Sequence, residues 1–216
     1  MEACGDSVKN ITLSVRRLTK IFNRRTIFKD VSFELSRGNS LAITGRNGSG
    51  KSTLLKILSG VLSSTFGEVC WTLEGKQYSQ EEVKHDFGLV SPYLQLYDEF
   101  TALENLHLLS EIRGMRNQSD ERIKLLLEQL LLWERRDDFI RTYSSGMKQR
   151  LKYAFALLHE PTILFLDEPT ANLDTDGIQA VRTFAKHQRE SGILIVATND
   201  EQESQWCENH IHLGHS

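Results

Sequence analysis

Residues 45–52 read Gly45-Arg46-Asn47-Gly48-Ser49-Gly50-Lys51-Ser52, and this stretch decides the fold. Its glycines lack Cβ atoms, so consecutive backbone N–H groups can turn inward and form a nest for an anion. The pattern predicts that Lys51 bridges the β- and γ-phosphates of a nucleoside triphosphate and that the Ser52 hydroxyl holds Mg²⁺. A strand is expected at 40–44, and Thr53 belongs to a helix whose positive N-terminal end points at the phosphates. We therefore predict a nucleotide site formed by residues 45–53.

A second chemical element follows much later in the chain and reads Ile163-Leu164-Phe165-Leu166-Asp167-Glu168. Four apolar residues predict a strand that is buried on both faces and delivers two carboxylates at its C-terminal end. That end of a parallel sheet is where such folds present their ligand site. We expect Asp167 to hold the Mg²⁺ shell and Glu168 to polarise an attacking water.

Composition bounds the class of protein. The chain has 216 residues, 39% of them hydrophobic and 25% charged, with a formal net charge of −3, which indicates neither disorder nor a nucleic-acid partner. It shows no secretory signal and no apolar run approaching about 20 residues, so we expect it not to cross a membrane by itself. Its three cysteines lack metal or disulfide spacing, which is typical of the cytosol.

Hydrophobic periodicity predicts the order of helices and strands. Paired strands are expected over 10–44, a helix over 51–60, a strand pair over 67–75 that turns at Glu74-Gly75, and a strand over 87–90. Two helices are expected over 101–113 and 119–133. The first places Leu103, Leu106, Leu109 or Leu108, and Ile112 on one side. The second places four apolar residues at helical spacing, namely Ile123, Leu126, Leu127 and Leu130. Beyond residue 145 the order helix, strand, helix, strand implies parallel pairing.

Basic residues gather near the N-terminus. We expect them to form a solvated face rather than a nucleic-acid patch. They are Arg16, Arg17, Lys20, Arg24, Arg25 and Lys29.

A third element lies just upstream of the Asp-Glu strand and reads Tyr143-Ser144-Ser145-Gly146-Met147-Lys148-Gln149-Arg150. It resembles the signature sequence of the ATP-binding-cassette (ABC) ATPases, with Ser144, Ser145 and Gly146 standing where that family has Ser-Gly-Gly. A hydroxyl, backbone N–H groups and a helix N-terminus are the parts that hold a γ-phosphate. In the family these groups serve the nucleotide of the opposite subunit, so the resemblance implies a dimer with two ATP molecules at its interface.

The resemblance covers about residues 10–213 and implies further roles. Asp174 ends a segment that matches the loop linking the two sites, and Phe22 sits where an aromatic ring stacks on the adenine. The implied α/β fold is a P-loop NTPase core with a mainly parallel sheet, an N-terminal antiparallel β lobe and a helical subdomain. We expect one domain over 1–216, with the β lobe and core at about 10–90 and 150–213 and the helical subdomain at 91–149.

Two positions depart from the family pattern. Pro92 stands where the family has a glutamine that touches Mg²⁺ and the attacking water, and Gln95 could replace that glutamine only if the loop is rebuilt. Asn199 stands where the family has a histidine on the γ-phosphate. An asparagine can donate a neutral hydrogen bond but cannot carry charge or shuttle a proton. The hypothesis from these residues is hydrolysis at a reduced rate, with Glu168 supplying the chemistry.

Three functions compete at this point. The first is the ATPase subunit of a membrane transporter, which implies a membrane-spanning partner, a second ATPase subunit and a peripheral location on the cytoplasmic face. Segments 101–106 and 173–177 are similar to the haem-exporter ATPase of cytochrome c maturation, which favours export. The second is a cassette ATPase acting on DNA or ribosomes, which the absence of a long coiled coil and of a second cassette disfavours. The third is a non-hydrolysing nucleotide switch, which Pro92 and Asn199 favour and the Asp167-Glu168 pair disfavours.

Overall fold

The chain starts as a long antiparallel hairpin. In a computed structural model, which describes residues 10–115 and 119–214, β1 (Ile11–Phe22) pairs with β2 (Arg25–Ser36), and β3 (Ser40–Thr44) follows. Asn23 and Arg24 form the two-residue turn with φ of 46° and 66°, the left-handed conformation that matches the twist of a tight hairpin. The strands predicted over 10–44 are confirmed.

The hairpin belongs to an antiparallel sheet with strand order β2-β1-β4-β5. β4 (Phe66–Leu73) and β5 (Lys76–Tyr78) turn at Glu74 and Gly75, as predicted, and both turn residues have positive φ. The strand pair continues to Tyr78, beyond the predicted end at 75. A short helix, α2 (Gln80–Val83), and a 3₁₀ turn then lead to the second sheet.

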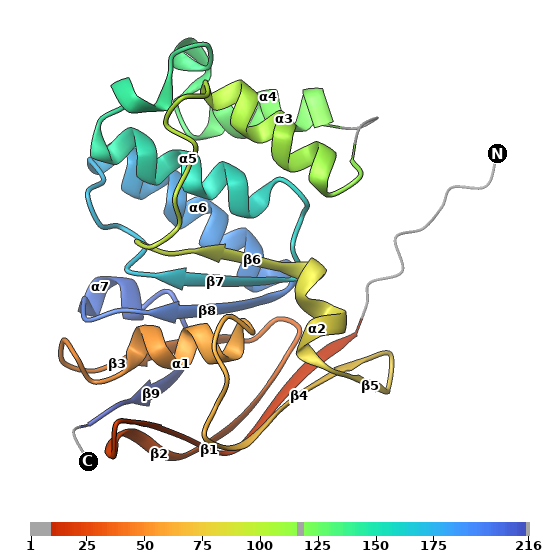
Figure 1. Cartoon of the computed structure of the whole chain (residues 1–216), viewed down its shortest axis with the longest axis vertical. Helices are drawn as coiled ribbons and strands as arrows, with labels where there is room; N and C mark the ends of the chain where they lie inside the picture. Colours follow the sequence, from red (N-terminus) through yellow and green to blue (C-terminus); the bar gives the residue numbers. More distant parts are fainter. Residues whose placement is uncertain (1–9, 116–118, 215–216) are drawn as a thin grey trace.

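The second sheet is parallel throughout and has the order β6-β7-β8-β3-β9. Its remaining strands are β6 (Phe87–Val90), β7 (Ile163–Asp167), β8 (Ile193–Ala197) and β9 (Asn209–His212). Because all strands run the same way, their C-terminal ends meet at one edge, where Asp167 lies in register with Ala197. Figure 1 shows this sheet across the middle of the molecule.

The parallel sheet separates two apolar cores. On β7, Ile163 and Phe165 face the core that contains the antiparallel sheet, whereas Leu164 and Leu166 face the other core. This alternation follows from the period of two in a strand, and both faces of β7 are buried because each is covered. The sequence interpretation of 163–167 as a doubly buried strand is confirmed.

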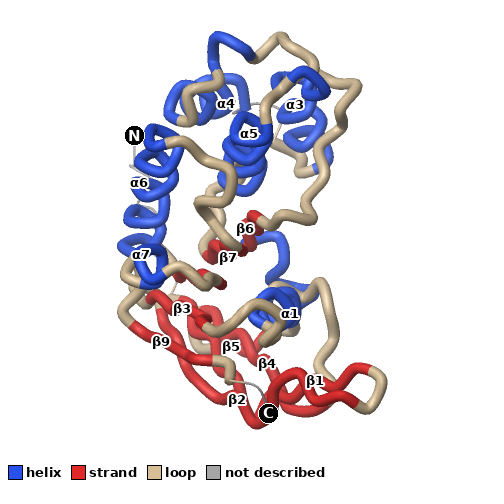
Figure 2. Tube along the Cα trace, turned by 90° about the vertical axis from the view of Figure 1, so that its left-hand side faces the viewer, coloured by secondary structure: helices blue, strands red, loops and turns tan. Residues whose placement is uncertain are grey.

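Helices cover the two faces unequally (Figures 1 and 2). α1 (Lys51–Leu58) packs between the parallel sheet and the antiparallel sheet. The opposite face carries α3 (Ala102–Ile112), α4 (Ser119–Gln129), α5 (Ser145–Leu157) and α6 (Thr175–Ser191). α1 and α5, which begin with the two predicted nucleotide motifs, therefore lie on opposite sides of the sheet.

Two predicted helices differ in detail. α3 starts from a capping box in which Thr101 and Glu104 bond each other's backbone N–H groups. Its Leu106 is buried, but Ile112 is 73% exposed, so the prediction that Ile112 shares the apolar side is wrong at the end of the helix. α4 ends at Gln129 rather than at 133, because the chain turns at Leu131, where φ is 57°. The four core residues predicted for a helix over 119–133 are all buried, although the last of them lies just beyond the end of α4; they are Ile123, Leu126, Leu127 and Leu130.

The basic N-terminal residues are exposed, as expected, with one exception. Lys20 is buried, and its Nζ donates to the Ser63 carbonyl oxygen at 2.6 Å. The prediction of a uniform solvated face is wrong for this residue because the loop after α1 folds over its side chain.

Candidate nucleotide site

The loop between β3 and α1 is shaped by its glycines. Gly50 is the N-cap residue of α1 and has φ of 100°. A Cβ atom at Gly50 would lie 2.5 Å from Ile27 Cγ2, so the hairpin leaves no room for a side chain. No side chain caps α1, and its first N–H groups are therefore available to an anion at the positive end of the helix.

Lys51 is folded back over the same loop. Its Nζ donates to the carbonyl oxygens of Gly45 and Arg46 at 2.9 and 3.3 Å, and only 6% of the residue is exposed. These two bonds fold the ammonium group back onto the loop that forms the predicted phosphate nest. The remaining loop residues predicted to bind nucleotide also lie in this loop and the first turn of α1; they are Asn47, Gly48, Ser49 and Thr53.

The Ser52 hydroxyl donates to Asp167 Oδ1 at 2.9 Å, which joins α1 to the end of β7. Asp167 is buried, and its pKa is raised by burial, opposed by the Ser52 hydrogen bond and increased further by the neighbouring charge of Glu168. A hydroxyl and a carboxylate in contact are hard oxygen donors of the kind Mg²⁺ prefers. The residues present therefore fit the predicted magnesium ion.

Glu168 begins the turn after β7 in an uncommon backbone conformation. Its φ is 50°, which costs a residue with a Cβ about 1–2 kcal/mol. Its N–H donates to the Ala197 carbonyl oxygen at 2.9 Å, and its own carbonyl oxygen accepts from Ala171 N at 3.2 Å. These bonds fix the turn and hold the half-buried Glu168 beside Asp167.

Asn199 follows β8 and reaches the phosphate loop. Its Nδ2 donates to Asn47 Oδ1 at 3.0 Å, although 152 residues separate the two in the sequence. Thr198 N donates to the Ile43 carbonyl oxygen at 3.0 Å, which continues the pairing of β8 with β3 and aims the next residue at the loop. The structure thus brings Asn199 to the predicted nucleotide site.

The signature segment begins α5 on the other side of the sheet. Ser144 is the N-cap, and its hydroxyl accepts from Met147 N at 3.2 Å. Ser144 and Ser145 are exposed. A Cβ on Gly146 would lie 2.8 Å from the Asn172 carbonyl oxygen, so a glycine lets the segment approach the loop after β7.

Three other predicted site residues belong to segments outside the phosphate loop. Phe22 ends β1 and is 42% exposed, with Lys20 Nζ 4.6 Å from its ring centroid, so one ring face is occupied. Asp174 caps α6 by accepting from Gly177 N at 2.9 Å. Gln95 lines a cavity of about 440 Å³ together with Ser145 and Asn172, on the side of the signature segment.

Sequence reasoning missed Lys152 of α5. Its Nζ donates to the carbonyl oxygens of Ser91 and Pro92 at 3.3 and 3.1 Å, and burial lowers its pKa. α5 therefore holds the loop after β6, in which Pro92 stands at the position of the family glutamine. A signal was present in the sequence, because Lys148 and Lys152 are four apart on a helix and share a face; Lys148 Nζ bonds Asp98 Oδ1 of the same loop at 2.8 Å.

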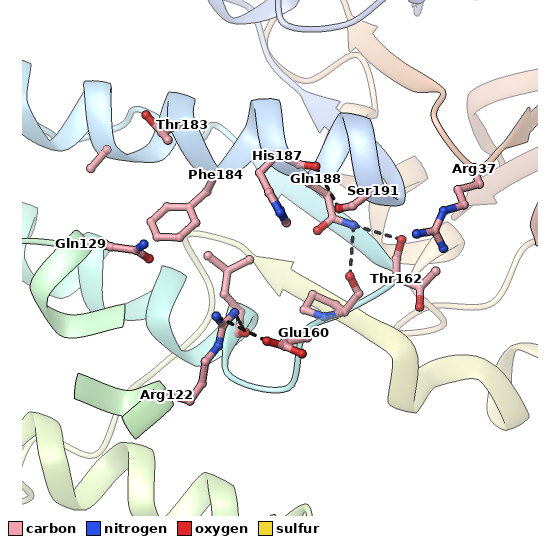
Figure 3. Close-up of a pocket in the computed structure, with 13 residues that line it drawn as sticks. Arg37, Arg122, Gln129, Glu160, Thr162, Thr183, Phe184, His187, Gln188 and Ser191 are labelled. Carbon is pink, nitrogen blue, oxygen red and sulfur yellow. Dashed lines mark hydrogen bonds and ion pairs between the residues drawn. The ribbon is translucent and has the colours of Figure 1, made fainter. Parts of the chain in front are cut away.

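A second cavity, of about 680 Å³, lies along α6 (Figure 3). It reaches Thr162, which precedes β7, and therefore lies at the end of the sheet opposite Asp167. Two of its polar side chains are held by neighbours: Gln188 Nε2 donates to the Pro161 and Thr162 carbonyl oxygens, and Arg122 pairs with Glu160. This cavity is separate from the nucleotide site.

The loop on α1, the Ser52–Asp167 contact and the parallel sheet define a P-loop nucleotide-binding domain of α/β fold. Residues 28–171 match the family model described as ABC transporter. The chain belongs to this family and is an ATP-binding-cassette ATPase domain. Among the helices within residues 10–115 and 119–214, none combines the length and the apolar content that crossing a bilayer requires.

Relatives of known name support this assignment. The lipoprotein-releasing system ATP-binding protein LolD of Treponema denticola is 35% identical over 207 residues, which cover 89% of this chain and 90% of LolD. The lantibiotic transport ATP-binding protein SrtF of Streptococcus pyogenes is 33% identical, over 87% of this chain and 79% of SrtF. The linearmycin resistance ATP-binding protein LnrL of Bacillus subtilis is 32% identical over 88% of this chain, which spans only 62% of the length of LnrL.

Solved structures agree with the fold. An ATP-binding subunit of an ABC transporter superposes with a TM-score of 0.83 at 27% identity, over 94% of this chain and 86% of that one. The dimeric ATP-binding cassette MJ0796, in a post-hydrolysis state bound to ADP and Pi, superposes with a TM-score of 0.81 at 25% identity, over 93% and 94%. The predicted fold class is confirmed.

Proposed function

We propose that this chain hydrolyses ATP as the energy-converting subunit of a membrane exporter. The contact of Ser52 with Asp167, with Glu168 next in the chain and Asn199 on the phosphate loop, is the observation that carries the chemistry. The signature segment and the named relatives carry the assignment to transport.

Each site residue has a proposed role in the reaction. The loop N–H groups and Lys51 bind the phosphates, and Ser52 and Asp167 hold Mg²⁺, which when bound neutralises phosphate charge. Glu168 accepts a proton from a water molecule while the oxygen of that water attacks the γ-phosphorus. The bond from that phosphorus to the bridging oxygen breaks, and ADP leaves. Asn199 orients the γ-phosphate by a neutral hydrogen bond and takes no proton.

A second ATPase subunit would complete the site. α1 packs in one core and α5 in the other, so the parallel sheet separates the phosphate loop from the signature segment of the same chain. We therefore assign Ser144, Ser145 and Gly146, with the Asp174 loop, to the nucleotide of the second subunit. The exposure of the two serines supports this, as does the dimeric state of the solved relative. Phe22 would stack on the adenine with its free face.

The membrane partner has a candidate surface. Tyr93, Tyr97, Phe100 and Phe139 are exposed on and beside the loop after β6, and the rings of Tyr97 and Phe100 lie 5.5 Å apart. A cluster of exposed aromatic residues is typical of a protein interface. We propose that a cytoplasmic helix of the membrane-spanning subunit docks on this surface, within the 91–149 helical subdomain, and holds the chain on the cytoplasmic face. The words resistance and release in the names of two relatives favour export.

The test is Mg-ATP turnover by the purified chain beside Glu168→Gln, with Glu190→Gln, an exposed carboxylate of α6, as the matched control. We expect turnover to fall at least 100-fold in Glu168→Gln and to stay unchanged in the control. Light scattering should show an ATP-dependent dimer of Glu168→Gln. Equal turnover by all three proteins would refute the role of Glu168.

A slow nucleotide switch is the second candidate, because Pro92 replaces the family glutamine and Asn199 replaces the histidine. It predicts ATP-dependent dimerisation of the unaltered chain with turnover no faster than that of Glu168→Gln. The same two measurements therefore separate the two functions.

A further inference from the structure

Glu203 is a buried carboxylate on α7 (Glu201–Ser204) that the reaction described above does not use. One of its oxygens, Oε1, accepts from the N–H of Thr170 at 2.9 Å and from the hydroxyl of the same residue. Its other oxygen, Oε2, accepts from the hydroxyl of Thr198. Each carboxylate oxygen therefore binds a different loop of the nucleotide site.

The first of these loops contains Glu168. Thr170 lies two residues after Glu168, inside the turn that Ala171 N closes on the Glu168 carbonyl oxygen. Thr170 in turn accepts from Leu173 N at 3.1 Å through its carbonyl oxygen. Because the turn is closed by these bonds, a displacement of Thr170 is transmitted to the backbone of Glu168.

The second loop contains Asn199. Thr198 is fully buried, and its Oγ1 also accepts from Asp200 N at 2.9 Å. Asp200 Oδ1 accepts from Glu203 N at 3.3 Å. Both neighbours of Asn199 in the chain therefore belong to the same hydrogen-bond network as Glu203. Asn199 itself donates a hydrogen bond to Asn47 of the phosphate loop.

The local sequence gives Glu203 a different expected partner. Asp200 and Glu203 have the spacing of a capping box, in which the glutamate bonds back to the N–H of the cap residue. That N–H is instead bonded to Thr198. Glu203 is therefore not used for helix capping, and burying a carboxylate is costly unless its hydrogen bonds repay the lost hydration. All three donors that it receives come from the two loops.

We infer that Glu203 is a positioning residue that holds the turn of Glu168 and the loop of Asn199 in the relative arrangement that ATP hydrolysis needs. The inference rests on the roles proposed above for Glu168 and Asn199. Glu203 itself touches no phosphate-loop residue in any of these bonds.

The experiment compares Glu203→Met, which keeps the length of the side chain but accepts no comparable hydrogen bond, with Glu203→Gln and the unaltered chain. Glu201→Gln, an exposed carboxylate on the same short helix, is the matched control. A displacement of about 1 Å at reacting groups costs on the order of 100-fold in rate. We expect kcat to fall about 10- to 100-fold in Glu203→Met, with partial rescue in Glu203→Gln. KM and the Kd for ATP should stay within about twofold, because none of the bonds that Glu203 makes involves a residue of the phosphate loop.

Hydrogen exchange provides a second readout that does not depend on turnover. Peptides over 168–174 and 198–203 should both exchange faster in Glu203→Met, while peptides from β7 and β8 stay protected. Thr198→Val keeps the shape of the side chain but removes its bond to Glu203 and the acceptor of Asp200 N. It should lower kcat by itself and add less than its own effect to Glu203→Met, because both variants lose the bond between Thr198 and Glu203.

Unchanged kcat in a folded Glu203→Met, or unchanged exchange in both loops, would overturn the inference. So would a loss of kcat that is matched by an equal loss of ATP affinity. Glu168→Gln and Asn199→Ala are measured in parallel: if these retain full turnover, the proposed catalytic roles fail, whereas if they lose it and Glu203→Met does not, only the positioning role fails.

Discussion

Replacement of Gly50 by alanine should destabilise the fold through two separable causes. The first is the backbone, because φ of 100° is outside the range that L residues favour, at a cost of about 1–2 kcal/mol. The second is the new Cβ, which would lie 2.5 Å from Ile27 Cγ2 and force the hairpin to shift, as in an overpacked core, at about 1–3 kcal/mol. Together these give a loss of about 2–5 kcal/mol.

Gly48 supplies the matched control. Its φ is 80°, and a Cβ built on it would have no other atom within 4 Å. Gly48→Ala should therefore carry only the backbone cost. The difference in unfolding free energy between the two variants therefore measures the clash with Ile27, because both glycines belong to the same loop.

The assay is urea unfolding without nucleotide, followed by far-UV circular dichroism at one pH. With a slope of about 2 kcal/mol per molar urea, the midpoint should fall by about 1–2.5 M for Gly50→Ala and by about 0.5–1 M for Gly48→Ala. Adding Ile27→Ala to Gly50→Ala should relieve the clash. The double variant should therefore lose less stability than the two single variants lose together. Equal midpoints for the Gly50 and Gly48 variants, or full additivity with Ile27→Ala, would refute the packing argument.

Two further predictions concern pH. Burial, with a smaller contribution from Arg113, lowers the pKa of His159 to about 4, so below its ordinary pKa of 6.5 the unfolded chain binds a proton that the folded chain refuses. Stability should fall as pH drops from about 6.5 to 4 by up to about 3 kcal/mol, and His159→Gln should flatten this part of a denaturation-midpoint profile; an unchanged profile would contradict the burial argument. The pKa of Asp167 is raised, so its charge destabilises the nucleotide-free fold above the ordinary carboxyl pKa, and this cost disappears as pH falls below that pKa. Asp167→Asn should raise the melting temperature at pH 7, and the gain should shrink toward pH 4; a gain that does not vary with pH would point to packing instead.

Local patterns predicted the site motifs and most of the elements. Each of the three site motifs consists of residues that are adjacent in the chain: the loop 45–52, the strand ending in Asp167 and the signature segment. Predictions failed where a distant segment decides exposure. Ile112 has helical spacing but no partner at the end of α3, whereas Lys20 is covered by the loop that contributes Ser63. The residues that flank Ile112 and Lys20 in the sequence predict neither the exposure of the first nor the burial of the second.

The sequence by itself determined the order of the strands and helices and which chemical groups form the proposed nucleotide site, because glycine-rich loops, caps and apolar periods act over a few residues. Only the tertiary structure decided how these groups meet. Asn199 reaches Asn47 across 152 residues, Lys152 holds the loop of Pro92, and Glu203 joins the turns after β7 and β8. These contacts arise because the ends of parallel strands converge at one edge, and strand order in a sheet is fixed by packing between segments far apart in the chain.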